Sequence, residues 1–389
     1  MKQFDVVMFN MSNYSEWEEG VSNRNYHVLR QLQACPEIGK ILAIDYLPLT
    51  MKRALRIYKE DLVLNLKEGE VVRRRLGSKL TKVSEKLYVY TDINWFWRPN
   101  RTMKQIRKLA IELNFGDYVL WSFFPFIAPY WQKMGQKLIV FDAVDNWLLH
   151  SSYQKQQERL KRSYEIIKSQ ADLIFTVSKN LLNFFEDQAN VYWIPNGVDL
   201  LHYNQNFALL NRDIADIKKP IIGYIGVIQE KVDLDLVEFL AKNNPDKSIV
   251  MVGPVWDEQD PSRTRLANYA NVHFLGYKTY AEAPMYIQQF DLGIVPHKSS
   301  DFSASTNPMK IYEYLACGKP VVSTANVGTE NLDKIIKVGK TYEEFNKLVN
   351  EALQADDPQQ EAARQDFVKK YSWLNTVNKM LELINNKLN

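Results

Sequence analysis

The 389-residue sequence contains only two cysteines, Cys35 and Cys317. Two cysteines cannot form a disulfide framework, which favours a reducing, cytoplasmic setting. The five histidines show no spacing typical of metal ligands, so no metal is expected. The longest mainly apolar stretch, residues 118–131, is shorter than the ~20 residues needed to span a bilayer. We therefore expect a protein that is soluble or peripheral to a membrane.

The overall composition is that of a globular protein. Hydrophobic residues make up 46% and charged residues 24%, which excludes intrinsic disorder. At about 100–200 residues per domain, the length favours two domains. The formal charge is +3, yet residues 1–197 hold 28 Lys and Arg against 21 Asp and Glu, whereas the rest holds 21 against 25. A basic first half suggests an anionic partner. Ordinary variation in surface charge, without a function, would also produce this imbalance.

The apolar pattern predicts an α/β fold. Short apolar runs alternate with helical stretches, and continuous apolar runs are typical of parallel strands buried on both faces. The strands expected in the first half are 4–10, 41–47, 86–91, 118–123, 138–144, 173–177 and 191–195. Those expected in the second half are 221–227, 248–253, 272–275, 292–296 and 320–324. Two similar halves predict two Rossmann-like, doubly wound domains facing a cleft.

The predicted boundaries follow from this repetition. Residues 1–198 form the first domain, and 199–372 form the second. A polar segment from Asn196 to Pro220 is the expected linker. Residues 373–389 have a helical period of apolar positions, so we expect a C-terminal helix that crosses back onto the first domain.

The segment 307–322 is the most informative motif. Pro308 suits the first turn of a helix and Gly318 its C-terminal cap. Lys310 and Glu313 then lie on one side of the helix near its start, where free N–H groups favour an anion such as a diphosphate. An ordinary surface helix with a Lys–Glu pair would show the same spacing.

Two glycine-containing turns give weaker signals. A buried strand is predicted to end at Gly226, where the backbone can approach a ligand, and Lys231 follows within reach of a phosphate. Gly20 lies in a loop that follows the first strand and opens a helix. Each turn is equally consistent with a plain strand-to-helix connection, and the dinucleotide fingerprint G-x-G-x-x-G is absent.

The order and spacing of these motifs resemble the retaining GT-B glycosyltransferases of the family-four type, found in bacterial surface-polysaccharide and teichuronic-acid-type synthesis. The resemblance rests on the Gly20 loop, residues 194–199, 223–231, 290–296 and 310–322, and covers nearly the whole chain. It implies transfer of a hexosyl group from a nucleotide diphosphate-sugar, UDP- or GDP-linked, with no cofactor and no metal.

The resemblance also implies roles for individual residues. Glu313 matches the second glutamate of the E-x7-E motif, which binds the donor ribose, and Lys231 matches the diphosphate-binding lysine. Tyr277 falls where the base packs. The implied donor site comprises Gly20, Gly226, Lys231, Tyr277, Ser305, Asn307, Lys310, Ile311 and Glu313. Ser305 stands where the first motif glutamate is usual and Val227 where an arginine is usual, so Lys310 is the candidate for the missing cation.

In the first domain, Asp145 and His150 follow a predicted strand, where family members carry a histidine or an acid. With Lys231 and Lys310 they complete the expected catalytic set. A helix cap explains Asp145 equally well, and an exposed helix position explains His150. Asp233 and Asp235 form a D-x-D pattern, but Asp233 is better explained as a helix N-cap than as a metal ligand.

Residues 51–86 hold 11 Lys and Arg against 5 Asp and Glu, including Arg73, Arg74 and Arg75. No nucleic-acid-binding module accompanies them, so nucleic acid is not an expected partner. With the aromatic residues 95–97 and 121–126 nearby, the three arginines predict contact with an anionic membrane surface on the inner face of the cell membrane. A solvated basic face with buried aromatics is the alternative.

The sequence thus predicts a retaining, metal-independent glycosyltransferase that acts on a glycan or lipid-linked acceptor in surface-polysaccharide or glycolipid synthesis. Two alternatives remain. One is a GT-B nucleotide-sugar 2-epimerase, which would need further acidic and histidine residues. The other is a non-catalytic donor-binding partner of another transferase, which Ser305 and Val227 would suit.

Overall fold

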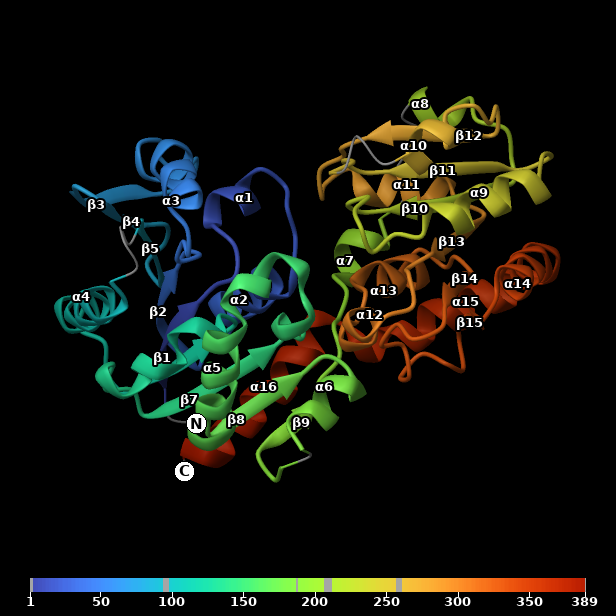
Figure 1. Ribbon diagram of the computed structural model, residues 1–389. Helices are drawn as coiled ribbons and strands as arrows, with labels where there is room; N and C mark the ends of the chain where they lie inside the picture. The colour runs from blue at the N-terminus through green and yellow to red at the C-terminus, as the bar shows by residue number, and fades with distance from the viewer. Residues whose placement is uncertain (1–2, 94–97, 187, 206–211, 257–260, 389) are drawn as a thin grey trace. The chain divides into compact units, whose positions relative to one another are not determined.

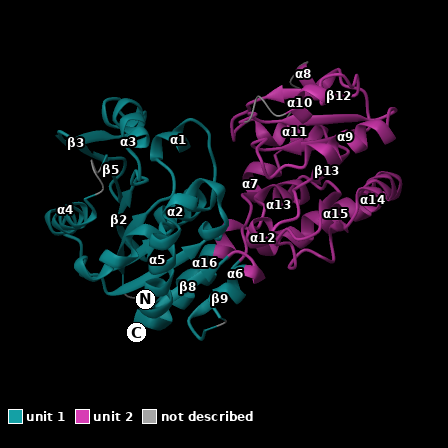
Figure 2. Ribbon diagram, in the orientation of Figure 1, with its two compact units in different colours: residues 1–176, 181–194, 377–389 teal, residues 177–180, 195–376 magenta. Residues whose placement is uncertain are grey.

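The computed structural model describes residues 3–93, 98–186, 188–205, 212–256 and 261–388. The chain divides into two compact units, coloured separately in Figure 2. Unit 1 comprises residues 1–176, 181–194 and 377–389, and unit 2 comprises residues 177–180 and 195–376. Both units are α/β, as the apolar pattern predicts.

Unit 1 is built on one sheet, which has nine strands among the described residues, in the order β3-β4-β5-β2-β1-β6-β7-β8-β9. Its strands are β1 (Phe4–Phe9), β2 (Ile38–Ile44), β3 (Glu70–Arg75), β4 (Ser78–Lys82), β5 (Leu87–Asp92), β6 (Tyr118–Ser122), β7 (Leu138–Ala143), β8 (Leu173–Thr176) and β9 (Val191–Trp193). All residues of β1, β6 and β7 are buried. The strands from β5 to β9 pair in parallel.

The sequence pattern did not predict the antiparallel hairpin β3–β4 at the edge of this sheet. The reason is physical. Strand β3 is mostly exposed and carries Arg73, Arg74 and Arg75, so it lacks the apolar run of a buried strand. Charged residues on an edge strand also oppose pairing with another chain.

The helical elements of unit 1 connect the parallel strands (Figure 1). They are α1 (Tyr14–Glu18), α2 (Arg24–Ala34), α3 (Met51–Ile57), η1 (Tyr58–Leu62), α4 (Pro99–Glu112), η2 (Pro125–Lys133), η3 (Trp147–Leu149), η4 (Ser151–Gln156), α5 (Gln157–Gln170) and, at the boundary with unit 2, α6 (Lys179–Phe184).

Unit 2 is built on a wholly parallel sheet, with six strands among the described residues, in the order β12-β11-β10-β13-β14-β15. These are β10 (Ile221–Ile225), β11 (Ser248–Val252), β12 (Val272–Gly276), β13 (Leu292–Val295), β14 (Val321–Thr324) and β15 (Lys337–Gly339). The strand order reverses between β10 and β13. Ligands of open α/β sheets bind beyond the carboxyl ends of the strands at such a switch point.

Helices cover both faces of this sheet and close a hydrophobic core on each. They are α7 (Leu200–Tyr203), α8 (Arg212–Ala215), α9 (Leu234–Asn243), α10 (Pro261–Leu266), α11 (Ala283–Gln289), α12 (Asp301–Ser305), α13 (Met309–Ala316), α14 (Tyr342–Ala355), α15 (Pro358–Val368) and η5 (Lys369–Tyr371). The cluster beneath α11 and α13 includes Tyr312 and Tyr314, and that beneath α9 and α14 includes Leu240 and Phe345.

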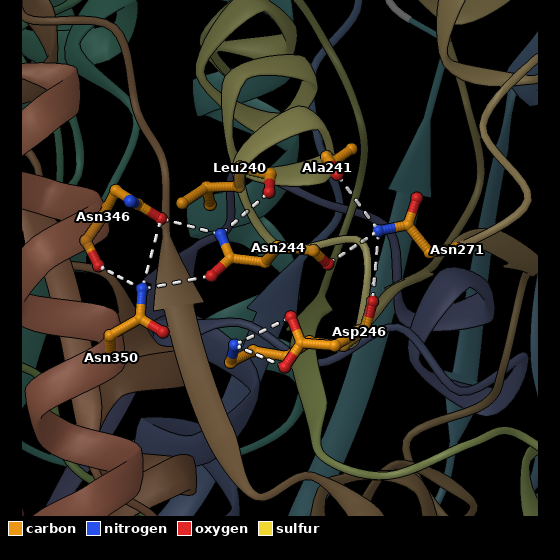
Figure 3. A network of polar contacts seen from close by, with 8 residues as sticks. Leu240, Ala241, Asn244, Asp246, Asn271, Asn346 and Asn350 are labelled. Atoms are coloured by element: carbon orange, nitrogen blue, oxygen red, sulfur yellow. Dashed lines mark hydrogen bonds and ion pairs between the residues drawn. The ribbon is translucent and has the colours of Figure 1, made fainter.

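A network of asparagines ties α9 to α14 (Figure 3). The buried Asn244 follows α9, and its Nδ2 donates to the carbonyl of Leu240 (2.8 Å) and to Oδ1 of Asn346 (2.7 Å). Asn350 Nδ2 donates to Asn244 Oδ1 (3.0 Å), and Asn271 Nδ2 donates to the Asn244 carbonyl (3.0 Å). The network satisfies carbonyls that the end of a helix leaves without intrahelical partners.

The last helix, α16 (Trp373–Leu388), is divided between the units. Residues 373–376 belong to unit 2, where the Trp373 N–H donates to the carbonyl of Val198 (3.1 Å). Residues 377–389 belong to unit 1, where Asn385 Nδ2 donates to Glu37 Oε2 (3.0 Å). Apolar side chains at 377, 380, 381 and 384 are buried.

In the described part of the chain, no helix combines the length and the apolar character needed to cross a bilayer.

Candidate functional site

The candidate site lies at the switch point of the unit 2 sheet. Gly226 directly follows β10, and His297 lies two residues beyond the end of β13. Helix α13 begins at Met309, after Pro308, and Gly318 follows its end with a φ of 73°. The helix predicted between Pro308 and Gly318 is therefore confirmed. Its N-terminus is a source of free N–H groups beside this edge of the sheet.

Close packing of α13 on the sheet sets the position of its first turn. The Tyr314 ring lies against Gly293 of β13, where a Cβ would come within 2.4 Å of the ring. The N–H of Ile225, the last residue of β10, donates to the Tyr314 hydroxyl (2.9 Å). A side chain at position 293 would push the helix away, so this glycine permits the close approach of α13 to β10 and β13.

Lys310, in the first turn of α13, extends over the turn at Gly226. Its Nζ lies 3.9 Å from the centroid of the Tyr224 ring, a cation–π geometry. A Cβ at Gly226 would lie 2.8 Å from this Nζ, and Gly226 has a φ of 132°. Glycine is thus required here by both backbone conformation and space.

The pKa of Lys310 is lowered well below its ordinary value. Burial is the main cause because it disfavours the charged form, and the positive charge of Lys231 adds to it, whereas Glu313 opposes it. Two basic side chains held near each other in a partly dry site are a favourable environment for a polyanion.

Lys231 is held by a short connection between two loops. Its carbonyl accepts the N–H of Lys298 (2.8 Å), and the next residue, Val232, forms an antiparallel bridge with His297. The loop after β10 and the loop after β13 are therefore fastened together. The structure brings Lys231, Lys310 and Gly226 to one region, as the motif spacing predicts.

His297 is a site residue that sequence reasoning missed. It is 1% exposed, and neither ring nitrogen has a hydrogen-bond partner among the described residues. Burial and the charges of Lys310 and Lys231 lower the pKa of His297 well below its ordinary value, so its ring is neutral at pH 7. A neutral imidazole offers one donor and one acceptor. Buried polar groups normally have hydrogen-bond partners, and a ligand group beside the lysines would supply them for the donor and the acceptor of this ring.

Glu313 lies one turn beyond Lys310 and is largely buried rather than on an exposed helix face. Burial raises the pKa of its carboxyl to about 7, while a hydrogen bond with Tyr203 and the charge of Lys310 oppose the rise. The alternative of an ordinary surface Lys–Glu pair is therefore wrong for this residue. A carboxyl group in this setting can accept hydrogen bonds from the hydroxyls of a ribose.

Three further residues of the expected donor site are engaged within the protein. Ser305 is fully buried, and its hydroxyl donates to the Phe302 carbonyl (2.7 Å). The Asn307 side chain accepts from Asn196 N–H (2.9 Å) and donates to the Gly328 carbonyl (2.6 Å). The Ile311 side chain lies in the hydrophobic core. Of these, Asn307 precedes α13 and Ile311 lies in its first turn, so both help to position the helix.

Residues 196–205, at the start of the expected linker, belong to unit 2, whereas residues 206–211 lie outside the described residues. Asn196 is buried and donates through Nδ2 to the Asn307 carbonyl (2.6 Å). Tyr312 OH also donates to Asn307 Oδ1 (2.9 Å). Asn196 therefore helps to anchor the beginning of α13.

Tyr277 follows the end of β12, and its side chain is 50% exposed. The preceding Gly276 has a φ of 69°, and nothing lies within 4 Å of a Cβ built on it. Tyr312 and Tyr314 lie in the core, whereas the exposed ring of Tyr277 can stack on a planar group.

The remaining predicted site residues belong to unit 1. Gly20 has a φ of 91° in the turn after α1, where its N–H donates to the Trp17 carbonyl (3.0 Å). Asp145 is partly buried just after β7. His150 Nδ1 accepts the N–H of Ser152 (3.1 Å), which is a cap at the start of η4. The expected catalytic set is thus divided, with Asp145 and His150 in unit 1 and the two lysines in unit 2.

The three arginines of β3 have separate partners. Arg73 forms an ion pair with Glu112 of α4 (2.7 Å), and Arg74 donates to Asn65 Oδ1 (2.6 Å). Arg75 donates to Gln105 of α4 (3.3 Å). Membrane contact by this group remains a prediction. The aromatic residues 95–97 lie outside the described residues.

Within residues 3–93, 98–186, 188–205, 212–256 and 261–388, no group of three or more His, Cys, Asp or Glu side chains could hold a metal. Asp233 caps α9 by accepting the Leu236 N–H (3.0 Å), as predicted, and Asp235 pairs with Arg265.

Comparison with known proteins agrees with this geometry. Residues 219–356, which contain Lys231, His297, Lys310 and Glu313, match the family model described as glycosyl transferases group 1. This part of unit 2 is thus similar to a glycosyl transferase group 1 domain. A relative in Bacillus subtilis (strain 168), the teichuronic acid biosynthesis glycosyltransferase TuaH, is 29% identical over 282 residues, covering 69% of this chain and 67% of that protein.

Solved structures show the same fold. The Anabaena protein Alr3699/HepE, in a complex with UDP and glucose, matches with a TM-score of 0.68 at 15% identity, covering 98% of this chain and 100% of that one. Sucrose-phosphate synthase from Thermosynechococcus elongatus matches with a TM-score of 0.67 at 11% identity, covering 99% of each chain. The fold of this chain is that of the GT-B glycosyltransferases.

Proposed function

We propose that this glycosyltransferase moves a hexosyl group from a UDP-sugar to an acceptor hydroxyl, with retention of configuration and without a metal, in the synthesis of a surface polysaccharide or glycolipid. The observation that carries the proposal is the cluster at the switch point of unit 2. There Lys310 and Lys231 lower the pKa of their neighbours, and a carboxyl group lies one helical turn away.

The chemistry of the cluster suits a nucleoside diphosphate. The diphosphate lies at the N-terminus of α13 and beside Gly226, where a side chain would come within 2.8 Å of Lys310 Nζ. Lys310 and Lys231 supply the positive charge, and Glu313 accepts from the ribose hydroxyls. Tyr277 stacks on the base. We favour uridine because the solved structure of Alr3699/HepE holds UDP.

In the proposed reaction, the bond between the sugar anomeric carbon and the β-phosphate oxygen breaks. A bond from the acceptor oxygen to the same carbon forms on the same face. The hydroxyl proton passes to an oxygen of the departing β-phosphate, so that UDP is the leaving group. The lysines and the helix N–H groups stabilise the charge that develops on this group, which is the largest contribution that such a site can make.

The acceptor is proposed to be a glycan or a lipid-linked saccharide, in line with the surface-polymer role in the name of the TuaH relative. A protein acting on a lipid-linked acceptor works at the inner face of the cell membrane, and the basic hairpin β3–β4 would face the anionic headgroups. This placement is part of the proposal.

A calorimetric titration with UDP, GDP and ADP tests the donor assignment, followed by hydrolysis assays with a panel of UDP-sugars. We expect UDP to bind most tightly and Lys310→Met to weaken its binding by at least 10-fold. Lys334→Met, which removes an exposed lysine elsewhere in unit 2, is the matched control and leaves binding unchanged. Equal binding of UDP to both variants would contradict the assignment.

The engaged side chain of Ser305, where the family motif has a glutamate, favours one alternative, a donor-binding partner without activity. Such a protein binds UDP-sugar but neither hydrolyses nor transfers the sugar. Inversion at C2 of the sugar during incubation would instead indicate a 2-epimerase.

A further inference from the structure

Unit 1 contains a cavity that has no part in the donor site. Its volume is about 560 Å³, and it lies between the turn of the β3–β4 hairpin, the end of β5 and the beginning of α4. These elements are neighbours in unit 1 (Figure 1). A volume of this size falls within the range of ~300–1,000 Å³ that is typical of small-ligand sites.

Positive charge dominates the lining of this cavity. Arg75 comes from β3, and Arg98 and Arg101 come from the start of α4. The acidic side chain in the lining is Asp92, at the end of β5, which accepts hydrogen bonds from the hydroxyls of Tyr90 (3.3 Å) and Thr102 (3.2 Å). Three guanidinium groups against one carboxylate leave an excess of two positive charges.

The cationic surface continues along α4. A second hollow of about 450 Å³ shares Arg101 and Gln105 with the cavity and adds Lys104 and Lys108. Residues 101, 104 and 108 follow the three- and four-residue spacing of one helix face. A ligand that extends from the cavity into this hollow would meet successive positive charges, as a chain with repeated anionic groups requires.

The arginines in the lining suit a ligand with an anionic group. Guanidinium groups bind carboxylates and phosphates through paired hydrogen bonds, and their planar geometry selects these oxyanions. The Tyr90 and Ser78 side chains add polar lining, while Met51 and Leu76 provide apolar walls. Apolar walls with a few placed polar and charged groups are typical of small-ligand sites, in which the polar groups fix the orientation of the ligand.

We propose that this cavity binds an anionic group, a carboxylate or a phosphate, of the acceptor saccharide. The identification of the ligand as the acceptor rests on the proposed function, whereas the binding of an anionic group to the cavity does not. The cavity is therefore the site that selects acidic over neutral acceptors, and the hollow along α4 holds the next acidic residue of the same chain.

The test compares two tetrasaccharides of equal length, a hyaluronan tetrasaccharide that carries carboxylates and the neutral chitotetraose. Glucose 1-phosphate serves as the phosphate-bearing probe. Binding to the full chain is measured by calorimetry at low and high salt. We expect the acidic tetrasaccharide or the sugar phosphate to bind, the neutral one to bind at least 10-fold more weakly, and the preference to decrease at high salt.

Arg101→Gln and Arg75→Gln should each weaken the binding of the acidic probe about 10-fold, the size expected for one charge-assisted hydrogen bond. Arg162→Gln on α5 removes an exposed guanidinium that does not line the cavity and is the matched control. The proposal would be overturned if the parent bound acidic and neutral probes equally, or if Arg162→Gln lost as much affinity for the acidic probe as the two cavity variants.

Vesicles of phosphatidylglycerol and phosphatidylcholine distinguish a membrane from a saccharide. If both arginine variants lose vesicle binding while no acidic sugar binds the parent, the basic face is a membrane surface and the proposal is wrong. UDP binding is measured separately in unit 2. If the parent protein binds the acidic sugar but not UDP, this inference holds and the proposed donor is wrong. If it binds UDP but not the acidic sugar, only this inference is wrong.

Discussion

Replacing Glu313 with glutamine should stabilise the protein and impair its binding of nucleotide. The carboxyl group has a folded-state pKa of about 7 against an ordinary 4.5, with burial as the main cause. Between these two values the folded state binds a proton that the unfolded state has lost, so the stability falls as the pH rises. Above pH 7 the ionised Glu313 carboxylate destabilises the folded state by the full amount, about 3 kcal/mol. Below pH 4.5 it vanishes because both states are protonated.

Glutamine retains the shape and can accept the Tyr203 hydrogen bond, but it carries no charge. Glu313→Gln should therefore increase the free energy of unfolding by up to about 3 kcal/mol at pH 8 and by only about 1 kcal/mol at pH 5. Urea denaturation at the two pH values measures this difference. Glu330→Gln, which neutralises an exposed carboxylate of unit 2, is the control and should show no such pH dependence.

The same variant should bind UDP about 1–3 kcal/mol more weakly at pH 8, because a charge-assisted hydrogen bond to the ribose is lost. With 2′-deoxy-UDP, much of the difference between variant and parent should disappear. A variant that is no more stable at pH 8 than at pH 5 would refute the electrostatic reasoning. Equal affinity of variant and parent for UDP would refute the role of Glu313 as ribose ligand.

Three further predictions concern the cationic part of the site. Lys231→Ala should reduce turnover by ~10²-fold with an intact fold, because one charge at the departing diphosphate is lost, and an unchanged kcat/KM would rule this role out. UDP binding should take up protons over the pH range in which Lys310 of the free protein titrates, since the diphosphate raises the lowered pKa of Lys310; titrations at several pH values in buffers of different ionisation enthalpy would show this uptake in the parent but not in Lys310→Met. His297→Gln should weaken UDP binding about 10-fold with little change in melting temperature, and unaltered affinity would mean that the unpartnered ring has no ligand.

Much of the fold could be predicted because it follows from local pattern. Buried parallel strands such as β1 and β7 are continuous apolar runs, and α13 is bounded by Pro308 and Gly318. The hairpin β3–β4 could not be predicted in this way, since its charged residues obtain their partners from α4 and from the loop before β3. An edge strand depends on tertiary context more than on its own composition.

The site was predictable to the extent that it lies on one motif. Lys310 and Glu313 are three residues apart on a helix whose ends the sequence marks, whereas their burial depends on packing against Tyr224 and Tyr203. No local sequence motif marks His297 as a site residue. Its position depends on the bridge to Val232, 65 residues earlier in the chain, and only the fold brings the two loops together.

The division of α16 between the units has a consequence for synthesis on the ribosome. Unit 1 contains residues 1–176 and 181–194, but it also needs residues 377–389, in which the apolar side chains at 377, 380, 381 and 384 are buried. About 180 residues of unit 2 are made between these parts. At ~5–20 residues per second, the nascent first unit waits roughly 10–40 s for its last helix. During that interval its sheet is complete in sequence, yet the surface that α16 covers is open to water and to chaperones. Unit 2 can therefore fold before unit 1 is finished, although it is made later.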